Sequence, residues 1–214
     1  MIDFDDIKKD LILVQGIAQE RIEEIKENIR LQTASKKYGI GCILGLGVYC
    51  IDYIDIEYKK TLRKQGAVFD TEADAKRILT KRDKYDKASF DKDGKLLFID
   101  GCYYKTKEKY QYYYFEHGEY FYYLYARDEK FYYNGYLTNL RGKMQDGKLL
   151  EWTKIDGDGL LWTYRYTHNG QEVIADTFIS VDTMEQPLAR DKFELVNGVV
   201  SNMVRLWDNM GKKE

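Results

Sequence analysis

The fold class follows from residues 103–136, YYKTKEKYQYYYFEHGEYFYYLYARDEKFYYNGY. This tract holds sixteen aromatic residues in thirty-four positions, and thirteen of them are tyrosine. Tyrosine combines a flat apolar ring with a hydroxyl that needs a hydrogen-bond partner when it is buried. Two short turn pairs, His117-Gly118 and Asn134-Gly135, interrupt the tract. The pattern is typical of a β-sheet, and it also suits a stacking surface for a ligand.

Turn pairs recur on both sides of this tract and divide residues 91–200 into short segments. Asn-Gly and Asp-Gly are the strongest short hairpin signals, because both central positions of a type I′ turn need a positive φ. We therefore predict an α+β chain in which residues 91–214 form a Tyr-rich antiparallel meander, as an open sheet or a partial barrel. The pairs are Asp93-Gly94, Asp100-Gly101, His117-Gly118, Asn134-Gly135, Asp146-Gly147, Asp156-Gly157, Asn169-Gly170 and Asn197-Gly198.

The N-terminal part, residues 1–37, is predicted to be an amphipathic helix. Its apolar residues recur with a mean spacing of about 3.67, the eleven-residue period of a straight helical seam. A single helix cannot bury its own stripe, so the seam packs either on the rest of the chain or against a second copy. The stripe consists of Ile7, Leu11, Val14, Ala18, Ile22, Ile25 and Ile29.

Residues 38–58 begin with the glycine-rich apolar run YGIGCILGLGVYCI. Glycine is common in membrane helices, and Gly41 and Gly45 have the spacing of a close-packing motif. Asp52 limits the uninterrupted run to a length more typical of a buried or interfacial segment. The alternatives are a membrane anchor, a buried hairpin and an amphipathic surface helix. An anchor predicts a membrane-associated protein, and a hairpin is compatible with a cytoplasmic one.

Residues 59–90 are predicted to hold a short helix and a connector. Asp70 or Thr71 is suited to the N-cap position, and acidic residues follow in the first turn. Residues 89–100 resemble a calcium-binding loop only superficially, because Ser89 stands at the first position and Asp100 at the last. We interpret these residues as a turn followed by a strand.

Composition and motifs exclude several function classes. A formal charge of −2 argues against a nucleic-acid partner, which usually requires a basic excess. Three cysteines without CxxC spacing are expected to be reduced thiols. The common nucleotide-binding and hydrolase motifs are missing, and His117 and His168 each lie beside a predicted turn. We expect no catalytic residue, no cofactor and no metal.

These observations predict a non-enzymatic interaction module. Its aromatic sheet would bind protein or carbohydrate, and residues 38–58 would tether it if they form an anchor. The alternative is a glycan-acting hydrolase that uses paired carboxylates among the aromatic strands, drawn from Glu116, Glu119, Asp128 and Glu151. The candidate binding surface consists of Tyr113, Phe115, Tyr122 and Tyr164.

Overall fold

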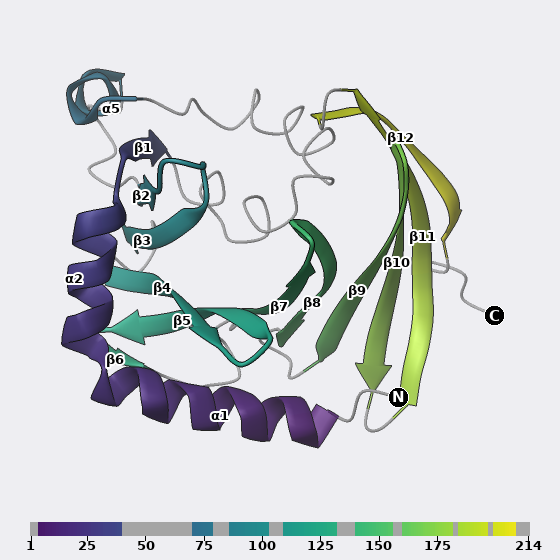
Figure 1. The fold of residues 1–214 in the computed structure, drawn as a ribbon, viewed down its shortest axis with the longest axis horizontal. Helices are drawn as coiled ribbons and strands as arrows, with labels where there is room; N and C mark the ends of the chain where they lie inside the picture. Colours follow the sequence, from purple (N-terminus) through teal and green to yellow (C-terminus); the bar gives the residue numbers. More distant parts are fainter. Residues whose placement is uncertain are drawn as a thin grey trace. The chain divides into compact units, whose positions relative to one another are not determined.

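The computed structural model describes residues 4–39, 70–78, 86–102, 109–131, 140–155, 160–181, 184–196 and 199–208. It confirms the α+β class: N-terminal helices precede a 12-stranded antiparallel open sheet (Figure 1). The helices are α1 (Phe4–Glu20), α2 (Ile22–Gln32) and α5 (Glu72–Ile78). The strands are β1 (Ser35–Gly39), β2 (Asp86–Phe90), β3 (Leu96–Cys102), β4 (Lys109–His117), β5 (Tyr120–Arg127), β6 (Lys130–Phe131), β7 (Leu140–Gln145), β8 (Lys148–Ile155), β9 (Leu161–Asn169), β10 (Glu172–Val181), β11 (Met184–Val196) and β12 (Val199–Asp208).

The sheet is the predicted meander. Its strands follow the order β1-β2-β3-β4-β5-β7-β8-β9-β10-β11-β12, and β6 pairs with β5 beside this path. Strands that lie side by side in the sheet therefore also follow one another in the sequence. Antiparallel neighbours are joined by tight hairpins and need no crossover connection. The turn residues in the sequence therefore predict much of the strand order.

The turn predictions succeed where the glycine has a positive φ. Asp146 (φ 52°) and Gly147 (φ 73°) form the type I′ pair between β7 and β8. The turn predicted at Asp100-Gly101 is wrong, because both residues lie inside β3. Asp100 is paired with Lys87 of β2 on one side and with Gln111 of β4 on the other. Neighbouring strands on both edges override the local turn preference.

The predicted N-terminal helix is two helices, separated at Arg21. Arg21 leaves the helical conformation (φ −109°, ψ 16°), and its N–H bonds to the carbonyl of Ala18, three residues back. Most of the apolar stripe is buried in the chain itself. Ile7, Leu11, Val14, Ala18 and Ile25 are buried, and Ile22 and Ile29 are half-buried. Self-association through this stripe stays a prediction.

The chain packs into two compact units. The first comprises Met1–Val14, Glu116–Tyr122 and Tyr133–Glu214, and the second comprises Gln15–Phe115 and Tyr123–Tyr132. In the first, the Asp10 carboxylate accepts hydrogen bonds from the Tyr122 hydroxyl (2.9 Å) and the Arg141 guanidinium (3.1 Å). These bonds attach α1 to the sheet of that unit.

The expected glycine-rich segment lies mostly outside the described residues. Its first two residues, Tyr38 and Gly39, belong to β1, and residues 40–58 are not described. No helix within the described ranges is both long and apolar enough to span a membrane. The predicted short helix exists as α5, and the Thr71 hydroxyl caps it by accepting the N–H of Asp74 (3.2 Å).

Candidate functional site

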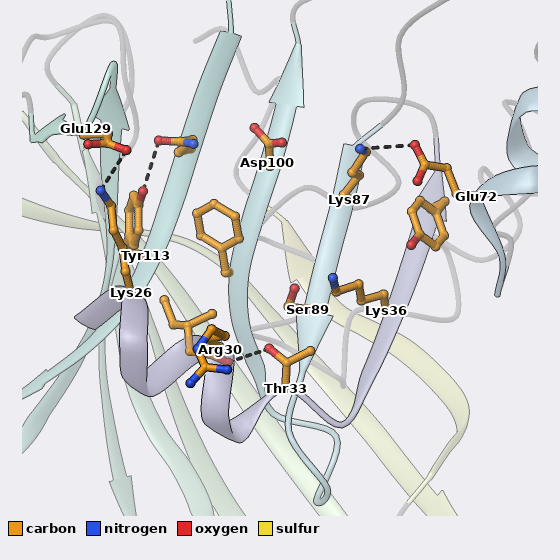
Figure 2. A pocket seen from close by; sticks show the side chains of 14 residues that line it. Lys26, Arg30, Thr33, Lys36, Glu72, Lys87, Ser89, Asp100, Tyr113 and Glu129 are labelled. Atoms are coloured by element: carbon orange, nitrogen blue, oxygen red, sulfur yellow. Dashed lines mark hydrogen bonds and ion pairs between the residues drawn. The ribbon is translucent and has the colours of Figure 1, made fainter. Parts of the chain in front are cut away.

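A groove with a volume of about 580 Å³ lies in the second unit, lined by α2, by α5 and by strands β1 to β4 (Figure 2). This volume is in the range of small-molecule binding sites. Lys26 and Arg30 line it from α2, and Glu129 from the turn between β5 and β6. Eight residues of β1 to β4 form its floor.

The floor residues form two rows that cross the strands. Residues two apart on a strand face the same side of the sheet, so each strand contributes two. The strand register then places them side by side on neighbouring strands. In order from β1 to β4, the first row is Lys36, Ser89, Phe98 and Tyr113, and the second row is Tyr38, Lys87, Asp100 and Gln111.

The α2 side of the groove is fixed by ion pairs. The Lys26 ammonium lies 2.7 Å from Glu129 and 3.0 Å from Glu23, and the hydrogen bond to Glu129 raises the pKa of Lys26. Arg30 is held by Glu27 at 2.6 Å. Both cations therefore have carboxylate partners of their own, which keeps their side chains in place.

The α5 side is also fixed by ion pairs. Lys87 lies 3.2 Å from the Glu72 carboxylate, which also pairs with Lys76 of α5 at 3.3 Å. On the other face of β1, Lys37 pairs with Asp70, directly before the helix. Because α5 is attached to β1 and β2 in this way, Glu72 is positioned at the end of the groove.

Aromatic rings supply the apolar part of the floor. The Tyr113 ring packs against Phe98, with 4.8 Å between ring centroids, and against Phe131 at 5.4 Å. Its hydroxyl donates to the Gln111 side chain at 3.1 Å. Burial raises the pKa of Tyr113 to about 12, so the hydroxyl is a neutral donor at physiological pH.

Two polar groups of the floor have no partner among the described residues. The Asp100 carboxylate and the Ser89 hydroxyl make no hydrogen bond or ion pair with any described residue. A carboxylate accepts hydrogen bonds, and a hydroxyl both donates and accepts. Polar groups at the bottom of a groove are normally satisfied by water or by a ligand. These two groups, next to Phe98, are therefore available to a bound molecule.

The four residues predicted as a binding surface lie at different places. Tyr113 lines the groove, but it is only 2% exposed. Phe115 is buried under the Arg21 guanidinium (5.6 Å), and Tyr122 is buried with its hydroxyl on Asp10. Tyr164 is half-buried and stacks on Trp152, with ring centroids 4.7 Å apart. Burial raises the pKa of Tyr164 to about 12.

The described aromatic residues of the tract do not form an exposed face. Every described aromatic side chain between positions 109 and 131 is buried or half-buried. In the centre of β5, five successive residues are buried, so both faces of this strand are covered. The rings therefore stabilise the sheet, chiefly as edge-to-face pairs such as Tyr112–Tyr125 and Tyr114–Tyr123.

The carboxylates proposed for glycan hydrolysis are not part of the groove. Glu119 pairs with Lys143, and Glu151 pairs with Arg165 at 3.3 Å. Asp128 lies in the turn before β6 with a positive φ of 49°. In the part of the chain that the structure describes, no cluster of three metal-ligating side chains is found. His117 is exposed, and the Nε2 atom of His168 contacts the Leu149 carbonyl at 2.7 Å.

The predicted binding surface does not include the groove residues that are available to a ligand, which are Ser89, Phe98 and Asp100. In the sequence, Ser89 and Asp100 stand at the two ends of a poor match to a calcium-binding loop, and Asp100 also belongs to the predicted turn Asp100-Gly101. The alternation of Phe98 and Asp100 in β3 was a usable signal, but the turn predicted at Asp100-Gly101 obscured it. Their alignment with Gln111 and Tyr113 depends on the register between β3 and β4, which composition does not reveal.

Comparison with known proteins adds no assignment. No family model, curated protein or solved structure matches this chain.

Proposed function

We propose that this chain is a non-enzymatic carbohydrate-binding module and that the sugar occupies the groove. One observation carries the proposal: the Asp100 carboxylate and the Ser89 hydroxyl, which have no partner among the described residues, lie on one sheet face beside Phe98, whose ring packs on the buried Tyr113. A sugar ring has an apolar face and a rim of hydroxyls. It needs this combination of aromatic surface, acceptors and donors.

The volume of the groove and the charges of its lining residues support a small polar ligand. The groove is large enough for one to a few sugar rings, since ordinary ligand sites measure about 300–1,000 Å³. The lining carries four cations, Lys26, Arg30, Lys36 and Lys87, against the acids Glu72, Asp100 and Glu129. This near balance does not favour a polyanion such as nucleic acid.

The ion pairs of the acidic residues in the groove favour sugar binding over sugar hydrolysis. Glu129 is engaged by Lys26, and Glu72 by Lys76 and Lys87. Glycoside hydrolysis needs an acid catalyst that can give up a proton to the leaving group, and an acid engaged by lysine is poorly placed for that role. Asp100 is thus the single carboxylate among the described groove residues without an ion pair, whereas hydrolysis uses two.

The test is a titration of the purified chain with a panel of neutral oligosaccharides, followed by NMR of the backbone amides. We expect shifts at residues of β2, β3 and β4. In Asp100→Asn, affinity should fall about tenfold or more, because a hydrogen bond to a charged acceptor contributes about 1.5–3 kcal/mol. The matched control is Asp93→Asn, an exposed carboxylate in the turn before β3, which should bind as the wild type does.

Two results would contradict the proposal. One is that no member of the panel binds, and the other is that Asp100→Asn binds as tightly as the unaltered protein. The same samples should be assayed for new reducing ends over time. Release of reducing ends that stops in Asp100→Asn would replace the binding module with the hydrolase alternative.

A further inference from the structure

Three of the four cations that line the groove already have carboxylate partners. Lys26 is held by Glu129, Arg30 by Glu27, and Lys87 by Glu72. An ion pair of this kind uses much of a cation's capacity to attract a further anion. These three side chains therefore act chiefly as structural parts of the wall.

Lys36 is different. No carboxylate within the described residues pairs with its ammonium group, although it lines the same groove. The neighbouring Lys37 faces the other side of β1 and has Asp70 as its partner. Lys36 is thus an exposed cation at the groove that no described carboxylate compensates.

The residue opposite Lys36 completes a pair of donors. The strand register sets Lys36 directly across from Ser89, a residue that is 7% exposed and whose hydroxyl has no partner among the described residues. Figure 2 shows the Lys36 side chain extended toward Ser89 over β2. An ammonium and a hydroxyl side by side can donate one hydrogen bond each to the two oxygens of a carboxylate.

We propose that the ligand is an acidic sugar whose carboxylate binds Lys36 and Ser89; this inference rests on the proposed carbohydrate-binding function. The negative charge of Asp100 favours a ligand with a carboxylate over one with a phosphate. It is a second uncompensated charge in the groove, and it would repel a dianion more strongly than a monoanion. The hydroxyls of a sugar acid satisfy Asp100 as donors, while its carboxylate compensates Lys36.

The backbone positions of Lys36 and Asp100 leave room for one sugar ring between them. Lys36 is on β1 in the first row and Asp100 on β3 in the second row, so their Cα atoms are two strand spacings apart across the sheet and two residues apart along it, or about 12 Å. A hexuronate ring with one hydrogen bond at each end has about this length. Its ring then lies over β2 and β3, where Phe98 provides the apolar surface.

The experiment compares matched pairs of ligands: the methyl glycosides of glucuronic acid and glucose, and those of galacturonic acid and galactose. Affinities are measured by NMR titration of the full chain at 50 mM salt. We expect at least one uronate to bind about tenfold more tightly than its neutral partner, as for one charge-assisted contact. Lys36→Gln should remove this preference, so that the uronate and its neutral partner bind this variant equally.

The matched control is Lys92→Gln, which changes an exposed lysine in the turn before β3 and should keep the preference. Ser89→Ala should reduce the preference severalfold. If Lys36→Gln retains the preference, or if acid and neutral partner bind equally, the acidic-sugar inference fails. The proposed function then still stands, provided that Asp100→Asn weakens the neutral sugar. If no sugar of either kind binds, the proposed function fails as well.

Discussion

At the scale of single residues, Gly142 is constrained by an aromatic ring. A methyl group on its Cα would lie 2.0 Å from the Cζ atom of Phe121 and 2.4 Å from its Cε1. We predict that Gly142→Ala lowers the free energy of unfolding by about 1–3 kcal/mol, the usual cost of overpacking. Urea denaturation followed by circular dichroism measures this change.

The clash should depend on the Phe121 ring. In a Phe121→Ala background, Gly142→Ala should lower the free energy of unfolding by only a fraction of what it costs in the wild type. A double-mutant cycle measures this difference. Equal effects in both backgrounds would show that Gly142 is required for another reason.

At the scale of elements, the turn between β7 and β8 depends on its left-handed conformation. Gly147 has a φ of 73°, and no heavy atom lies within 4 Å of the position that a Cβ would occupy. The cost of Gly147→Ala is therefore conformational and should be about 1–2 kcal/mol of unfolding free energy. Chemical denaturation of this variant measures it.

Gly16 in α1 is the matched control for this turn. It also has open space around it, but its φ is not in the positive range. Gly16→Ala should raise the free energy of unfolding by about 0.5–1 kcal/mol, because alanine is the better helix former. A loss of stability in Gly16→Ala, or no loss in Gly147→Ala, would contradict this account.

At the scale of the whole molecule, buried tyrosines in both units make the fold sensitive to alkali. Burial raises the pKa of Tyr113 and of Tyr164 to about 12, and it also raises the pKa of Tyr122. An unfolded tyrosine titrates near pH 10. Because the neutral form is favoured in the folded chain, this stabilisation is complete below pH 10 and is lost as the pH rises toward 12.

We therefore predict that the free energy of unfolding falls steadily between pH 10 and 12. Denaturation at fixed pH values measures the decline, and absorbance at 295 nm should report tyrosines that titrate late. The double variant Tyr113→Phe and Tyr164→Phe should show a shallower decline. A stability that is constant over this pH range would contradict the prediction.

The class of the fold could be predicted from local signals in the chain. Aromatic runs with alternating faces indicated strands, Asp146-Gly147 indicated a hairpin, and Thr71 indicated the start of α5. Each of these depends on a few adjacent residues, because φ preferences, caps and hairpin turns are local properties of the backbone.

The site depended on contacts between residues far apart in the chain. Tyr113 and Tyr122 were candidates for a binding surface, and side chains from other elements bury both rings. Asp100 was predicted to lie in a turn, and pairing with β2 and β4 holds it in a strand. Turn pairs and aromatic runs in the sequence predict an α+β meander. The register between neighbouring strands, in contrast, places Lys36, Ser89 and Asp100 in one groove. Register is set by packing across the sheet, and a shift of one residue would turn each of these side chains to the other face.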